Sequence, residues 1–282
     1  MKQRLSILSD AYISFNEDDG WAIASHIALT TLMSMFPFLI FLTALAGFFG
    51  SKELADQAAV ILLEAWPEQV ARPISSEIHN VLTQSRGGLV TAGAVLALYF
   101  SSSGVEAIRV GLNRAYGVRE KRAWWLLRLE SVAYVLVGAM ALLALAFLVV
   151  LGPLIWSGIV QSFPALSPLA GAVTLARYAF TTLLLAVALL IAHKWLPAED
   201  HRVRQVMPGV VLTVLLSILF AFAFAAYLTE FARNYVTTYA GIASVMIALV
   251  FLYALASIFV FGGELNAAIA RARRRSESSP LY

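Results

Sequence analysis

The sequence predicts an all-α integral membrane protein with six transmembrane helices and both termini on the cytoplasmic side. Three observations predict this fold. The 282 residues are 60% hydrophobic and only 13% charged, whereas soluble domains carry about 25% charged residues. Six apolar runs approach or exceed the roughly 20 residues that a helix needs to cross a bilayer. Finally, Lys and Arg gather in alternate connecting segments, which is the distribution that the positive-inside rule describes.

The chain divides into three parts. Residues 1–20 form a cytoplasmic or interfacial segment, and its Asp18-Asp19-Gly20 end followed by Trp21 is typical of a helix start with an aromatic anchor. A single membrane domain follows over 21–270, and a basic cytoplasmic tail over 271–282. The predicted spans are about 21–49, 88–105, 132–156, 175–195, 206–228 and 239–266. The first span is longer than a crossing requires, and Pro37 predicts a kink within it.

The connecting segments decide the orientation. With the N-terminus inside, fifteen of the 20 Lys and Arg fall on the cytoplasmic side. The first outside segment, 51–86, is predicted to form two amphipathic helices that cap the bundle. The second span continues in helical pattern to Tyr116 and ends at Gly117. The segment 157–174 has no charge and two prolines, which indicates a short loop or a re-entrant turn.

Polar residues recur at helical spacing on three spans, so on each they share one face. They are His26, Thr30, Met33 and Pro37 on the first span, Ser102, Glu106, Arg109 and Asn113 on the second, and Tyr253, Ser257 and Glu264 on the last. In the predicted orientation these stripes approach the cytoplasmic side. We therefore expect one cytoplasm-facing polar cavity, lined by His26, Glu106, Arg109, Glu264 and Asn266, with Arg114 close by.

Each of these residues also has a structural interpretation. Ser and Thr in membrane helices commonly bond a carbonyl one turn back. Glu106 can pair with Arg109 or Arg114 to satisfy a helix end. Glu264 with Asn266 can tie two helices together, and His26 can be a packed core histidine. The sequence leaves these alternatives open.

Enzyme motifs are weak. The chain has no cysteine, and its four histidines are scattered without a zinc-binding spacing. No Gly-rich phosphate loop or nucleophile elbow is present. We therefore expect no catalytic residue, metal or cofactor. The basic loops report topology and contact with anionic lipid, and they do not indicate nucleic-acid binding.

Three blocks resemble the YihY/BrkB family of bacterial inner-membrane proteins, once labelled ribonuclease BN. They are Ala24–Ile40, which ends in a Phe-Pro step, Ser101–Val118, with a Ser-Gly and an Asn-x-x-aromatic pattern, and Thr238–Ala267, with a Gly-x-Glu-x-Asn pattern. The likeness covers nearly the whole chain. It implies a six-helix membrane fold without an agreed activity, and it carries no role to His26, where the family often has another residue type.

Two kinds of function follow from these observations. The first is an inner-membrane transporter or flippase-like protein, whose polar cavity takes an anionic or amphiphilic, lipid-like substrate. Arg109 and Arg114 would attract the anion, while Glu106, Glu264 and His26 would couple protons or gate. The alternative is a non-transporting envelope or virulence-associated protein that binds partners through the 51–86 cap. Membrane-bound ribonuclease activity is disfavoured, because no metal site supports it.

Overall fold

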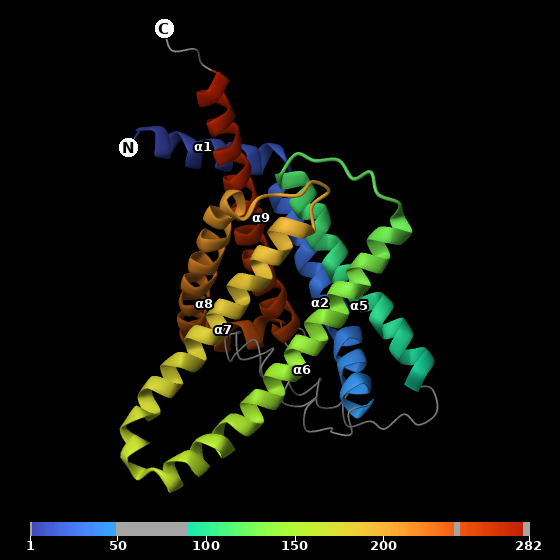
Figure 1. Cartoon of the computed structure of the whole chain (residues 1–282). Coiled ribbons are helices and arrows are strands. Elements are labelled where there is room, and N and C mark those ends of the chain that lie inside the picture. Colours follow the sequence, from blue (N-terminus) through green and yellow to red (C-terminus); the bar gives the residue numbers. More distant parts are fainter. Residues whose placement is uncertain (1, 49–89, 240–242, 279–282) are drawn as a thin grey trace.

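The computed structural model describes residues 2–48, 90–239 and 243–278, and within these ranges it is all helical (Figure 1). The helices are α1 (Lys2–Glu17), α2 (Gly20–Phe48), α5 (Val90–Ala115), α6 (Trp124–Ser162), α7 (Ala170–Trp195), α8 (Val203–Tyr239) and α9 (Ala243–Ser278), with a 3₁₀ turn η1 (Pro164–Leu169) between α6 and α7. The all-α prediction is confirmed. The predicted 51–86 cap lies outside the described residues.

Five described helices are long and apolar enough to cross a membrane: α2, α5, α6, α8 and α9. In α7 the apolar stretch found is shorter, Thr182–Trp195. The chain is therefore a multi-pass membrane protein by length and composition. The sixth crossing and the cytoplasmic placement of the termini stay predictions.

Helix ends follow local chemistry. The break between α1 and α2 falls at Asp19, which has a positive φ of 57°, and α2 begins at Gly20 as the sequence predicts. The helix α5 ends in a Schellman motif: Gly117 takes the left-handed conformation, φ 66°, and the Val118 N–H donates to the Asn113 carbonyl at 2.9 Å. The predicted stop at Gly117 is thus confirmed.

Several helices run beyond the predicted apolar spans. The helix α6 begins at Trp124, eight residues before the predicted span, because its first turns hold charged residues that pair with α5. The segment 157–174, predicted as a short loop or a re-entrant turn, is helical to Ser162, turns through η1 and enters α7 at Ala170. The helix α9 continues through the basic tail to Ser278.

The core forms where α2, α5 and α9 pack together, with α8 against α9 and α1 across one end (Figure 1). One large cluster contains Leu39, Leu42 and Phe251, and a second contains Ile27, Leu112 and Val260. The helices α6 and α7 leave this bundle as a long arm that turns at η1 (Figure 1). Large apolar side chains stay exposed on the arm and on α8, as expected for surfaces that face lipid.

Candidate functional site

Buried and half-buried polar side chains gather at one end of the bundle. There α1, the end of α5, the start of α6, the α7–α8 connection and the second half of α9 meet (Figure 1). The polar side chains form two regions that differ in chemistry. We call the first the ionic cluster, made of Glu106, Arg109, Glu120, Arg122, Arg128 and Glu130. We call the second the α9 polar core, made of Tyr116, His193, Glu264 and Asn266.

In the ionic cluster each charge meets an opposite one. The guanidinium of Arg109 is 3% exposed, and its Nη2 lies 3.3 Å from Glu130 Oε2. Glu130 Oε2 also accepts from Arg122 Nη1 at 3.0 Å, and Arg122 Nη2 reaches Glu120 Oε2 at 2.8 Å. Charges removed from water are tolerated when they are paired in this way. The cluster therefore explains how α5 keeps a buried arginine.

The cluster continues into the loops. Hydrogen bonds from Arg122 hold the pKa of Glu120 at about 2, far below its ordinary value, and Glu120 in turn raises the pKa of Arg122. Asn113 donates to Glu120 at 3.2 Å and accepts from the backbone N–H of Ala198 at 2.7 Å. Arg122 Nη2 also donates to the Leu196 carbonyl at 3.1 Å. These bonds fix the α7–α8 connection against the end of α5.

Arg128 joins α6 to α5. Its Nη1 lies 2.9 Å from Glu106 Oε2 and donates to Ser102 Oγ at 2.9 Å. Its guanidinium also lies 3.9 Å from the centre of the Tyr99 ring, a cation–π geometry. Arg128 on α6 thus contacts these three side chains of α5, and its pair with Glu106 joins the two helices.

The α9 polar core is centred on Asn266. Its Nδ2 donates to the Val206 carbonyl at 3.0 Å and to Tyr116 Oη at 3.1 Å, while its Oδ1 accepts from the Gly209 N–H at 2.7 Å. The helices α8 and α9 approach closely here, and Gly209 permits this because it has no Cβ. A Cβ at this position would overlap the carbonyl oxygen of Gly262. Asn266 therefore ties α9 to both α8 and the end of α5.

Tyr116 connects Asn266 to a buried histidine. Tyr116 Oη lies 3.0 Å from His193 Nδ1, and His193 is fully buried. Its Nε2 has no hydrogen-bond partner among the described residues. On the other side, the Tyr116 ring lies 4.2 Å from the ring of His201. Burial raises the pKa of Tyr116 far above its ordinary range, and the Glu264 carboxylate adds to this effect.

Glu264 is the most unusual member of the α9 polar core. Its side chain is 1% exposed, and neither carboxylate oxygen has a hydrogen-bond partner among the described residues. The charges that act on it come from Asp18 near the α1–α2 break, Arg114 at the end of α5 and Arg271 on α9. An ionised carboxylate without a donor is costly to bury. Glu264 therefore differs from the paired acids of the ionic cluster.

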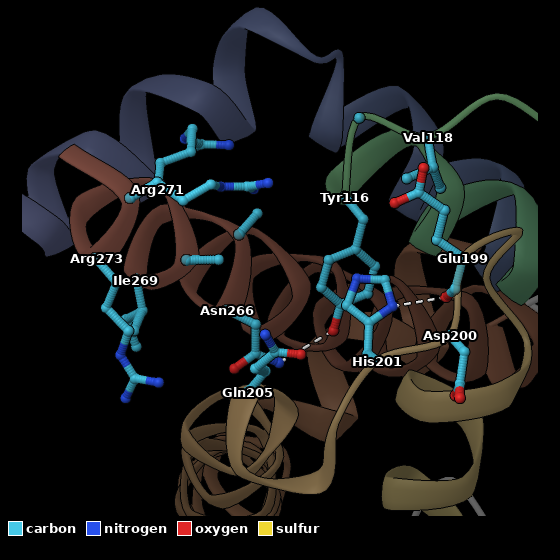
Figure 2. Close-up of a pocket in the computed structure, with 14 residues that line it drawn as sticks. Tyr116, Val118, Glu199, Asp200, His201, Gln205, Asn266, Ile269, Arg271 and Arg273 are labelled. Atoms are coloured by element: carbon cyan, nitrogen blue, oxygen red, sulfur yellow. Dashed lines mark hydrogen bonds between the residues drawn. The ribbon is translucent and has the colours of Figure 1, made fainter. Parts of the chain in front are cut away.

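A pocket of about 580 Å³ opens beside this core (Figure 2). Tyr116 and Asn266 line it, and the dashed bond between them is visible in Figure 2. One wall comes from α9 and is basic, while the other comes from the α7–α8 connection and is acidic. The lining residues are Tyr116, Gly117, Val118, Glu199, Asp200, His201, Gln205, Asn266, Ala267, Ile269, Ala270, Arg271, Arg273 and Arg274.

Comparison with known proteins decides the family. The family model described as virulence factor BrkB matches residues 11–281. The chain belongs to the BrkB family. The match covers every residue of the ionic cluster, the α9 polar core and the pocket.

Other BrkB-type sequences are similar over most of the chain. A Bacillus subtilis (strain 168) protein named as ribonuclease-like, YfkH, is 27% identical over 99% of this chain and all of its own length. A UPF0761 membrane protein of Rhodospirillum centenum (strain ATCC 51521 / SW) is 26% identical over 94% of this chain. A UPF0761 membrane protein of Kangiella koreensis is 19% identical over 89%. The chain spans 57% and 60% of the lengths of these last two proteins. No solved structure matches the chain.

In this BrkB-family protein, the predicted site residues are distributed over several places. Glu106, Arg109 and Asn113 lie in or beside the ionic cluster, and Ser102 bonds Arg128. Arg114 pairs with Asp18 and Asp19 at 3.4 and 3.6 Å. Ser257 donates to the carbonyl of Tyr253 at 2.8 Å, which is the one-turn-back bond that its structural interpretation describes. Of the predicted set, Asn266 lines the pocket, whereas Glu264, two residues earlier on α9, does not.

The stripe on α2 is not brought to the pocket. His26 and Met33 are exposed, and Thr30 and Pro37 are half-buried. None of the four lines the pocket. The helix continues through Pro37. Shared spacing on one helix thus placed these residues on a common face without deciding which way that face points.

Sequence reasoning missed several members of the site. Tyr116, His193 and His201 come from three different segments, and nothing in their spacing indicates that their rings meet. The sequence indicates Arg122 and Arg128 only as members of a basic, topology-setting loop, and it does not single out Glu130. Two acids, Glu120 and Glu130, lie among or beside the basic residues of that loop, and this placement indicates ion pairing rather than simple charge bias. Within the described ranges, no group of three His, Cys, Asp or Glu is placed to hold a metal ion.

Proposed function

We propose that this protein moves an anionic or amphiphilic, lipid-like solute across the bacterial inner membrane, with the 580 Å³ pocket as its cytoplasmic binding site. The observation that carries the proposal is the continuity between pocket and interior. Tyr116 and Asn266 line the pocket, and the same two side chains bond His193 and the start of α8 inside the bundle. A ligand that displaced either bond would act directly on the packing of α8 against α9.

The charge of the pocket supports an anionic group as the ligand. Arg271, Arg273 and Arg274 lie along the α9 wall. Arg271 Nη2 donates to Ser14 on α1 at 2.8 Å, which fixes this guanidinium near the pocket. Arginine presents several donors in a planar fork and suits carboxylate and phosphate groups. The opposite wall is acidic through Glu199 and Asp200, so a solute with both charges also fits this arrangement.

Glu264 and His193 are the groups that we propose to couple the cycle. Both are buried, and both have polar atoms without a hydrogen-bond partner in the described part of the chain. Intramembrane ionisable residues of this kind are characteristic of proton relays in transporters. In this proposal, Glu264 takes up or releases a proton when α8 and α9 change their contact at Asn266.

The proposal is tested in proteoliposomes. The protein is reconstituted with tail-labelled fluorescent phosphatidylglycerol, and the label in the outer leaflet is quenched by dithionite with and without a pH gradient. We expect wild-type protein to move the lipid and Glu264→Gln to slow this movement at least tenfold. Glu230→Gln is the matched control, because Glu230 is exposed on α8, far along the chain from the pocket. Equal rates for Glu264→Gln and Glu230→Gln, or no movement by wild type, would contradict the proposal.

We infer that the ribonuclease-like name of YfkH does not describe this chain. The acidic residues that line the pocket are Glu199 and Asp200, and Asp200 lies 3.9 Å from the ammonium of Lys194. A labelled RNA incubated with purified protein should remain intact with or without a chelator. Cleavage that disappears in a Glu199→Gln/Asp200→Asn variant would overturn this inference.

A further inference from the structure

A second cavity, of about 260 Å³, lies between α7 and α8, on a different face of α8 from the pocket. Its lining is entirely apolar: Leu183, Ala186, Val187, Leu190, Met207, Val210, Val211, Val214 and Leu215. Figure 1 shows α7 and α8 side by side where they approach their connection. Met207 and Val211 are 41% and 47% exposed, so the groove opens outward. Val206 and Gly209, which bond Asn266, hold the other side of α8 against α9.

Both helices place a cation at the polar end of this groove. Lys194 follows the lining residue Leu190 by four positions on α7, and Arg204 precedes Met207 by three and Val211 by seven on α8. These spacings put each cation on the same helix face as the groove lining. The ammonium of Lys194 also lies 4.5 Å from the centre of the Trp195 ring. Tryptophan and lysine side by side are typical of the headgroup level of a membrane protein.

The cations are available to an external anion. Arg204 is exposed. Lys194 has Asp200 as an ion-pair partner, but the N···O distance is 3.9 Å and the Asp200 side chain is 77% exposed. The Lys194 side chain is 23% exposed, but a long pair whose carboxylate is open to water contributes little, because water screens it. A phosphate that approaches Lys194 therefore competes with a weak partner.

We propose that the α7–α8 groove binds one acyl chain of an anionic glycerophospholipid, with the phosphate held by Lys194 and Arg204. The apolar lining matches a hydrocarbon chain that runs along the helices, and the two cations match a headgroup at its end. A surface that only contacts bulk lipid does not require a groove and a paired charge in register. This site is separate from the pocket, and it does not depend on the transport proposal.

The test measures lipid binding by native mass spectrometry of the full-length protein in detergent. Dioleoyl phosphatidylglycerol and dioleoyl phosphatidylcholine are titrated separately, so the acyl chains are identical and only the headgroup charge differs. We expect wild type to bind phosphatidylglycerol more tightly than phosphatidylcholine. The Lys194→Gln/Arg204→Gln variant should bind phosphatidylglycerol about 25-fold more weakly than wild type does, since each of the two cations near a phosphate adds roughly a fivefold factor. Phosphatidylcholine binding should stay unchanged in that variant.

Matched variants separate the groove from general effects. Arg202→Gln removes an exposed cation next to the same helix without touching the groove face, and it should leave both lipids unaffected. Ala186→Phe fills the groove and should weaken the binding of both lipids. Ala188→Phe adds the same ring on another face of α7 and should leave the binding of both lipids unchanged. Equal loss in the double variant and in Arg202→Gln, or equal binding of the two lipids to wild type, would overturn the proposal. Unchanged lipid binding in Ala186→Phe would also overturn it, provided that a charge-state distribution like that of wild type shows the variant to be folded.

Discussion

The ionic cluster and the α9 polar core lie at the same end of the bundle and treat buried charge in opposite ways. In the ionic cluster, Arg109, Glu130 and Arg122 neutralise one another over distances of 3.0 to 3.3 Å. In the α9 polar core, Glu264 is as deeply buried as Arg109 but has no hydrogen-bond partner among the described residues.

The difference distinguishes polar groups that hold the helices together from polar groups to which we assign a functional role. A closed set of ion pairs is costly to open and holds helices in one arrangement. A buried ionisable group without a partner has no such reason to be there, and in membrane proteins it marks a functional position by default. We therefore propose that the ionic cluster fixes α5, α6 and the α7–α8 connection, and that the α9 polar core is the region that responds to a ligand. The following predictions test this division.

The largest expected effect is from Glu130→Ala, in the ionic cluster. It leaves Arg109 buried without its carboxylate partner, and the free energy of unfolding should fall by about 3 kcal/mol. Chemical unfolding in mixed micelles measures this change. The exposed acid Glu199 supplies the control, because Glu199→Ala should change stability by less than about 0.5 kcal/mol. A Glu130→Ala protein as stable as this control would show that the cluster is not structural.

A somewhat smaller loss is expected for Asn266→Ala. The change leaves the Gly209 N–H and the Val206 carbonyl without the partner that they have now, and unfolding should become easier by about 2 kcal/mol. Loss of stability here would show that Asn266 also holds the α8–α9 contact. If stability were nearly unchanged while transport was altered, Asn266 would act in function and would not hold the fold together.

The sharpest comparison uses the same substitution in both regions. Glu264→Gln removes a carboxylate that has no hydrogen-bond partner among the described residues, so stability at pH 8 should be unchanged or rise by up to about 1 kcal/mol. Glu106→Gln weakens the pair with Arg128 and should lower stability by about 0.5 kcal/mol, because this pair is partly exposed. Both values come from the same unfolding assay. A marked loss for Glu264→Gln would reveal a stabilising partner for the carboxylate and remove the contrast.

The smallest effect concerns pH. The pKa of Glu120 is about 2 in the folded protein, against an ordinary value of 4.5, so its folded state favours the charged form. Its contribution to stability is complete above about pH 4.5 and is lost as the pH falls towards 2. Melting temperatures recorded between pH 6 and 3 should fall less steeply for Glu120→Gln than for wild type. Parallel curves for the two proteins would show that the bonds from Arg122 do not hold in solution.

Much of the fold follows from local properties of the sequence. The apolar runs indicate which segments form membrane helices, and the chemistry of Asp19-Gly20 and Gly117 sets two helix ends within a residue. Other ends were predicted less well. The charged first turns of α6 and the basic end of α9 are helical although they are not apolar, since their side chains pair or reach solvent from a helix that has already formed.

The candidate site followed the sequence only where the spacing lay within one helix. Ser102, Glu106, Arg109 and Asn113 do share a face of α5, and all four find polar partners there. Their partners are from α6 and the loops, and the expected pairing of Glu106 within α5 gives way to Arg128 on α6. The stripe on α2 had the same spacing, but His26 and Met33 face outward.

The sequence by itself determined the class of the protein, because hydrophobic length, charge content and helix-end chemistry are properties of contiguous residues. It also marked Glu264 and Asn266 as polar groups in an apolar helix. Only the tertiary structure decided that Asn266 bonds Tyr116 and α8, and that Tyr116 reaches His193. It also decided that Glu264 has no hydrogen-bond partner within the part of the chain that the structure describes. The physical reason is that periodicity fixes the relative angle of residues on one helix, whereas the rotation of each helix against its neighbours is set by packing of the whole bundle.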